Sequence, residues 1–162
     1  MAASLFNKLN DENVDESALL QMFNDGTGFY ADANITDADQ IAAVLALNNA
    51  GKKLGNKTAA YGDSSVQPKI AGFLTEYAQD VSTNFNQQAA AGVAGTYSTT
   101  SRVVRVNGKG MELNQVFAKS LIGALVMDQV AYGYLSEVKI GDGVDNDASA
   151  LGAGQYTTME HH

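Results

Sequence analysis

The sequence contains no cysteine, no tryptophan and one proline, and its only two histidines are the final residues, His161 and His162. Without cysteine, neither disulfide bonds nor thiolate chemistry can contribute to the fold or to catalysis. Charged residues are few, at 17%, but 18 acidic residues against 10 basic ones give a net charge of −8. A chain this acidic is repelled by phosphate backbones, so we expect no nucleic-acid partner.

Long hydrophobic runs are also missing. The most apolar stretch, from Leu121 to Leu135, is interrupted by Asp128 and Gln129, so we expect no transmembrane segment. The first residues, MAASLFNKLN, lack the basic and apolar regions of a secretion signal, which indicates a cytosolic protein or one whose signal has been removed. A length of 162 residues with 45% hydrophobic residues suits one domain with a real core.

Apolar residues recur with helical spacing along most of the chain. The predicted helices are delimited by capping residues such as Asp15, by a glycine after a helix C-terminus and by Pro68 in a first turn. These are expected around residues 5–9, 15–26, 36–51, 65–85 and 111–136. Two long stretches rich in Gly, Ser and Thr, 89–109 and 137–154, are expected to be loops, and RVVRV at 102–106 is the one strand-like piece. The sequence therefore predicts an all-α, up-and-down helical bundle, with residues 1–162 forming a single helical domain.

The last residues contain the beginning of a further helix. Thr157 and Glu160 have the spacing of a capping box, yet only two residues follow Glu160. Because a helix of one turn is hardly stable, this pattern favours a chain truncated just inside an element. The alternative is that His161 and His162 are the remnant of a purification tag.

Residues 109–129 resemble a bacterial lipoprotein domain family of unknown function, found mostly in Bacteroidota and marine bacteria. The resemblance rests on the spacing K-G-x-E-x-N-Q-x-F-x-K-x-L-x-G-A-x-x-x-D-Q and on the segments NKTAAYGDSS (56–65) and YTTMEHH (156–162). That family is distantly similar to imelysin-type helical bundles, which are cell-envelope proteins connected with iron uptake. The resemblance implies an imelysin-like bundle, a location in the cell envelope (periplasm or outer-membrane lipoprotein), and native histidines at 161 and 162. It also implies that this chain is the N-terminal part of a larger domain, whose C-terminal half would be a partner.

Asp128 is the most informative single residue. It lies near the centre of the apolar face of the helix predicted for 111–136, where a carboxylate must find hydrogen-bond donors. Asp128 has one of two roles. Either it is a structural residue whose carboxylate accepts hydrogen bonds from a helix N-terminus, a tyrosine or an arginine such as Arg102 or Arg105, or it is part of a ligand site. The candidate ligand-binding residues are Asp128, Glu112, Gln115 and Arg105, in a crevice lined by the long loops.

Two hypotheses for function follow. The first is a non-catalytic cell-envelope module that binds a small ligand or an envelope component, since no nucleophile elbow, P-loop or dinucleotide motif is present. The second is an imelysin-type metal- or iron-binding protein or metallopeptidase, completed by the C-terminal half. His161 and Glu160 would then be metal ligands, and the cofactor would be a divalent metal or iron.

Overall fold

The computed structural model describes residues 2–27, 38–49, 53–59 and 65–135. The elements run in the order α1 (Ala2–Lys8), α2 (Glu16–Asn24), α3 (Ala38–Asn49), α4 (Leu54–Thr58), α5 (Val66–Glu76), the π-helical turn η2 (Tyr77–Val81), β1 (Gly95–Ser98), β2 (Val103–Val106), α6 (Leu113–Asp128) and the π-helical turn η3 (Gln129–Tyr134). Among these residues, no helix has the length and apolarity needed to cross a bilayer.

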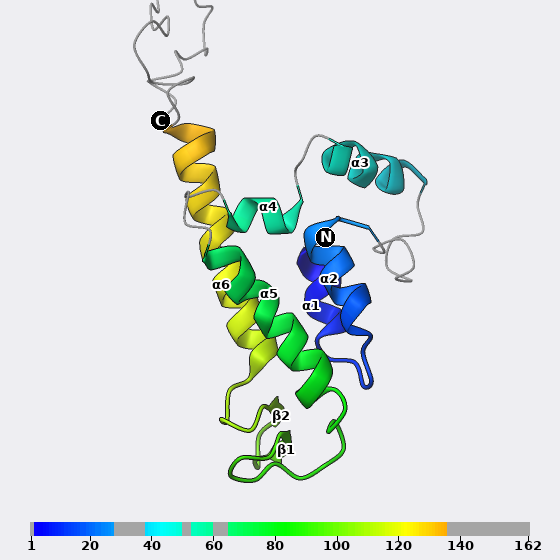
Figure 1. The fold of residues 1–162 in the computed structure, drawn as a ribbon, viewed down its shortest axis with the longest axis vertical. Coiled ribbons are helices and arrows are strands. Elements are labelled where there is room, and N and C mark those ends of the chain that lie inside the picture. The colour runs from blue at the N-terminus through cyan, green and yellow to red at the C-terminus, as the bar shows by residue number, and fades with distance from the viewer. Residues whose placement is uncertain (1, 28–37, 50–52, 60–64, 136–162) are drawn as a thin grey trace, which may run out of the picture.

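Two long antiparallel helices form the backbone of the fold. Figure 1 shows α5 and α6 side by side, with α1 and α2 beside them, α4 near one end and the two strands at the other. The core lies between α1, α2, α5 and α6, and Phe23 and Phe117 meet edge to face at its centre, 6.2 Å between ring centroids. Burial of these apolar faces against one another is the main force that holds the helices together.

The helix ends follow from local chemistry that the sequence discloses. The Asp15 carboxylate accepts a hydrogen bond from the Ser17 amide at 3.0 Å, as an N-cap of α2 should. Beyond the end of α2, Gly26 adopts a φ of 66°, which glycine tolerates best. At the other end of the core, the Ser82 hydroxyl donates to the Ala78 carbonyl and accepts from the Val14 amide, so it connects the end of η2 to the segment before α2.

The prediction of an all-α fold is wrong, because β1 and β2 form a two-stranded antiparallel sheet. The register pairs Gly95 with Val106 and Ser98 with Val103. The RVVRV segment does supply one strand, but its partner, GTYS, has the composition of a loop. The Thr99 hydroxyl accepts hydrogen bonds from the Ser101 and Arg102 amides and so fixes the turn between the strands.

The short helix α4 was also not expected from the sequence. Its five residues, LGNKT, include a glycine and are too few to display a helical period. Gly55 is needed there because a Cβ atom at this position would lie 2.8 Å from the Gln67 side-chain nitrogen and 3.2 Å from the Phe23 carbonyl oxygen. The absence of a side chain therefore lets α4 approach α2 and α5 closely.

Candidate functional site

Asp128 is buried at the end of α6 and forms an ion pair with Lys57 of α4. The Lys57 Nζ lies 2.6 Å from the Asp128 Oδ2, and their side chains are 24% and 8% exposed. The predicted burial of Asp128 is thus confirmed, but its observed partner is a lysine, not Arg102 or Arg105. Because both charges are compensated, this contact has the character of a structural link between α4 and α6.

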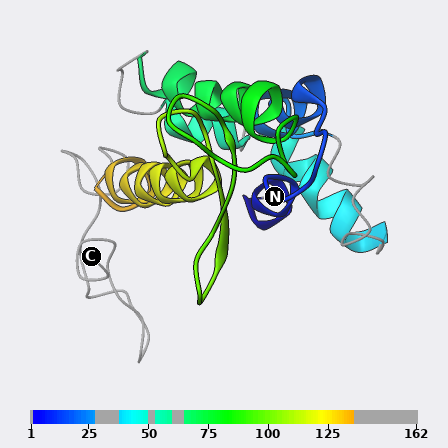
Figure 2. The ribbon, with the colours of Figure 1, turned by 90° about the horizontal axis from the view of Figure 1, so that it is seen from below.

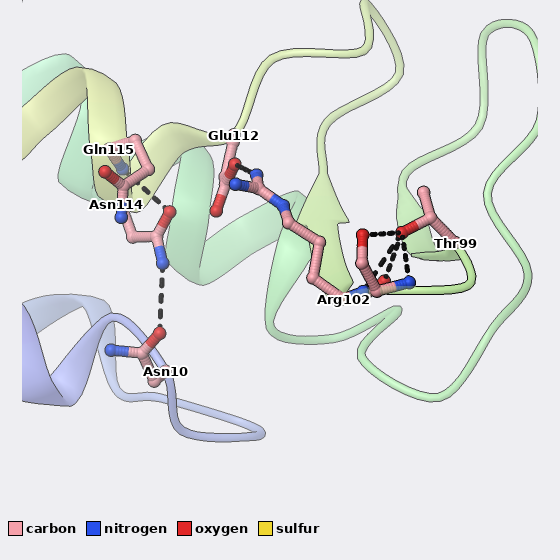
Figure 3. Close-up of polar contacts among 7 residues, drawn as sticks. Asn10, Thr99, Arg102, Glu112, Asn114 and Gln115 are labelled. Atoms are coloured by element: carbon pink, nitrogen blue, oxygen red, sulfur yellow. Dashed lines mark hydrogen bonds and ion pairs between the residues drawn. The ribbon is translucent and has the colours of Figure 1, made fainter.

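Glu112 lies at the opposite end of α6, where it forms an ion pair with Arg102 (Figure 3). Its backbone carbonyl also accepts hydrogen bonds from the Gln115 and Val116 amides, as expected at a helix start. Next to it, the Asn114 side chain donates to the Asn10 Oδ1 at 3.0 Å, which connects α6 to the segment after α1 (Figure 3). These contacts fix the beginning of α6 against the sheet and the N-terminal helices.

Arg105 lies on β2 and its guanidinium group stacks on the Phe85 ring, 3.4 Å from the centroid. Its Nε is buried and has no hydrogen-bond partner among the described residues. Arg105 also affects the pKa of Tyr77. Burial raises the pKa of the Tyr77 phenol to about 12; the positive charge of Arg105 lowers it by a smaller amount, and the negative charge of Asp11 raises it further. Arg105 therefore belongs to the contact between the sheet and the end of α5.

The four predicted ligand-binding residues do not share one site. Glu112 and Asp128 are 16 residues apart on one helix, which separates them by about 24 Å at 1.5 Å per residue. Arg105 contacts Phe85, whereas Gln115 lines a groove between α1 and α6. Their role in ligand binding stays a prediction, but three of them also have structural partners in the fold.

Asn107 is a polar centre that sequence reasoning missed. Its side chain is 1% exposed: the amide donates to the Glu76 Oε1 at 2.7 Å, and the Oδ1 accepts from the Lys109 and Met111 amides. It therefore shapes the turn between β2 and α6 and connects this turn to α5. The Asn-Gly pair at 107–108 is a turn signal, but the contact with Glu76 has no local sequence signature.

An apolar groove of about 380 Å³ lies between α1 and α6. Its lining comprises Ala2, Ala3 and Phe6 of α1 and Gln115, Phe117, Ala118, Lys119, Leu121, Ile122 and Leu125 of α6. The alanines leave space between the two helices, while Phe117 and Leu121 belong to the core below. Gln115 and Lys119 provide the polar groups of the groove. Its volume lies within the range of small-molecule sites.

Two further hollows flank the long helices. One, of about 470 Å³, lies between α5 and α6 and includes Ile70, Phe73, Gly123 and Met127 in its lining. The other, of about 550 Å³, lies beside the sheet among Ala89–Gly92, Tyr97 and Val106–Gly110. The lining of this second hollow is mostly alanine and glycine, with Tyr97, Asn107 and Lys109 as its polar side chains.

The predicted metal ligands His161 and Glu160 lie outside the described residues, as do Thr157 and the second predicted loop. Within the described part of the chain, no group of three or more His, Cys, Asp or Glu side chains is placed to hold a metal ion. The metal and iron hypothesis therefore stays a prediction.

The fold is thus a small, mostly helical domain, with a two-stranded sheet at one end and an apolar groove between α1 and α6. Comparison with known protein families gives a match: the model of a domain of unknown function, DUF4856, matches residues 1–162. The chain belongs to this family. No curated protein and no solved structure matches it.

Proposed function

We propose that this domain is a non-catalytic binding module of the cell envelope, which holds a small apolar ligand in the groove between α1 and α6. The observation that carries the proposal is the groove itself. Its volume of about 380 Å³ and its almost wholly apolar walls suit an aliphatic chain.

The polar residues of the groove suggest the other end of the ligand. Gln115 and Lys119 lie on the same side of α6, one turn apart. An ammonium group and an amide together favour an anionic end group, such as a carboxylate. We therefore assign the ligand to the class of aliphatic carboxylates of medium length.

Several charged side chains outside the groove have partners within the fold. Lys57 and Asp128, Arg102 and Glu112, and Lys8 and Asp11 are paired with one another. Paired charges of this kind hold parts of the fold together, so these six side chains have structural uses. Location in the envelope is inferred from the resemblance to envelope lipoproteins and is tested by fractionating cells that express the gene: a purely cytosolic pool contradicts it.

Displacement of the dye anilinonaphthalene sulfonate by decanoate tests the ligand class. We expect decanoate to displace the dye, decanol to do so less well, and Lys119→Gln to remove the difference between them. Ala118→Leu, which fills the groove, should weaken binding by about tenfold or more, equivalent to about 1.4 kcal/mol.

Ala18→Leu is the matched control, since Ala18 is exposed on α2, away from the groove. It should leave decanoate binding unchanged, and circular dichroism should show that both variants fold. The proposal fails if wild-type protein does not bind decanoate, or if the two leucine substitutions have equal effects.

A further inference from the structure

The outer face of α6 is apolar and exposed. Val126 is 55% exposed and Val130 of η3 continues the same face, while Ile122 (61%) and Met127 (50%) lie at its two edges, where they also border the hollows toward α1 and α5. The inner face of α6 is apolar too, since Leu113, Phe117 and Leu121 belong to the core. Between Lys119 and Asp128, residues 121–127 of α6 (LIGALVM) are all apolar, so this part of the helix is hydrophobic on all sides, as is typical of a helix in the interior of an assembly. Its exposed outer face is therefore suited to contact with a partner.

Gly123 lies in the middle of this face and marks where a partner can approach. No heavy atom lies within 4 Å of the position that a Cβ atom would occupy, so nothing in the described fold requires a glycine there. Glycine in a helix interior is less stable than alanine. The distance between two packed helices depends on the side chains at their contact, and a glycine at this point admits a second helix at close range.

Helix α3 has the complementary property. Its sequence, ADQIAAVLALNN, holds one acidic and no basic residue, and Ala42, Ala43, Leu45 and Ala46 are exposed. It makes no extended contact with any other described element and stands apart from them in Figure 1, and in Figure 2 it lies on the side of the molecule away from α6. Like α6, it is an apolar helix that leaves much of its surface in water.

The two helices are on opposite sides of the molecule. Figure 1 shows α4 between α3 and α6, and α4 is held to α6 by the ion pair of Lys57 and Asp128. In this arrangement α3 does not lie on the outer face of the α6 of its own molecule. A second molecule can present its α3 to this face directly.

We propose that α3 of a second copy packs across Gly123 on the outer face of α6, and that the contact is reciprocal and forms a dimer. A helix of 12 residues is about 18 Å long. One face of it buries roughly 300 Å² on each partner at a helix diameter of about 10 Å. Two such contacts bury about 1,200 Å², at the lower limit for a stable interface.

Analytical ultracentrifugation of the 162-residue chain tests the dimer. An interface of this size predicts dissociation at micromolar concentrations, so the range from about 1 to about 100 µM should span the transition. Gly123→Glu should give a monomer throughout, and Leu45→Glu should do the same from the other side of the contact. A wild-type chain that is monomeric up to about 100 µM overturns the proposal.

Gly72→Glu is a matched control, because Gly72 is exposed in the middle of α5 and also has no atom within 4 Å of its Cβ position. Both substitutions introduce the same charge into a helix and replace a glycine. The Gly72 variant should dimerise as the wild type does. Equal loss of the dimer in both variants would show that net charge, not the face of α6, controls association, and would contradict the proposal.

The absence of native cysteine allows a second test by oxidation of engineered cysteines. A mixture of Leu45→Cys and Val126→Cys chains should form a disulfide-linked heterodimer in preference to either homodimer. In a chain carrying both cysteines, the product should be a dimer. A disulfide within one chain would place α3 on its own α6 and overturn the assignment to a second copy.

Discussion

The ammonium group of Lys57 lies 2.6 Å from the carboxylate of Asp128, and this contact joins α4 to the end of α6 across 71 positions of the sequence. Lys57 keeps about a quarter of its side chain in water, while Asp128 is nearly covered. In this ion pair the carboxylate is therefore buried, whereas the ammonium group remains partly accessible to water.

Removal of one partner of this pair should destabilise the domain. Asp128→Ala leaves the ammonium without its acceptor, and we expect a loss of about 1–3 kcal/mol in the free energy of unfolding. Asp128→Asn should recover little of this, because the partner is a cation. Replacing both residues, with Lys57→Met and Asp128→Leu, should restore or exceed wild-type stability. Urea denaturation measures the free energy of unfolding of each variant. If the value for Asp128→Ala equals that of the wild type, the ion pair does not contribute to stability.

A second prediction concerns Asn107. Asn107→Ala leaves the Lys109 and Met111 amides and the Glu76 carboxylate without their partner, at a cost of about 1–3 kcal/mol. Asn107→Asp keeps the acceptor but brings a second carboxylate to Glu76, so it should also destabilise. Combining it with Glu76→Gln exchanges the amide and the acid and should restore stability. If the double variant is no more stable than Asn107→Asp, charge repulsion is not the cause.

Stability should fall at alkaline pH because of Tyr77. Burial raises the pKa of this phenol to about 12, from 10.0 in a model compound. Between these values the folded chain keeps a proton that the unfolded chain has lost. Stability is therefore unaffected below pH 10 and declines as the pH rises toward 12, by at most about 2–3 kcal/mol. Urea denaturation at several pH values, compared with Tyr77→Phe, isolates this contribution. Tyr97→Phe, at an exposed tyrosine, should retain the wild-type slope.

Two glycines within helices should respond in opposite directions to alanine. Gly72→Ala meets no atom within 4 Å, so the higher helix propensity of alanine should stabilise the domain by about 0.5–1 kcal/mol. Gly55→Ala brings a methyl group against Gln67, Asn24 and the Phe23 carbonyl, and should destabilise it. Thermal melts of both variants measure the difference, and stabilisation by Gly55→Ala would contradict the close contact of α4 with α2.

The sequence predicted those parts of the fold that depend on local chemistry. Asp15 as an N-cap and Pro68 in the first turn of α5 are both found as expected. Each follows from a residue and its neighbours within one or two turns. The periodicity of the longest helix also placed Asp128 correctly on the inner face.

Contacts between distant segments could not be predicted in this way. Lys57 lies on a helix of five residues, too short to show a period, so the sequence indicates a helix N-terminus, a tyrosine or an arginine as the partner of Asp128 and not this lysine. The strand GTYS has no alternating pattern and becomes a strand only by pairing with β2. The groove between α1 and α6 depends on how two helices lie against each other, which apolar patterning alone does not determine.

The early helices α1 and α2 depend on residues that the ribosome adds much later. Leu5, Leu9 and Phe23 are covered by side chains of α5 and α6, and the Asn10 side chain is bonded to Asn114, 104 positions away. Contacts so distant in sequence slow folding, because a long loop must close before they can form. During synthesis, the apolar faces of α1 and α2 must remain uncovered until α6 has emerged. A nascent chain that ends before Leu121 should therefore bind chaperones, and one that includes all of α6 should release them.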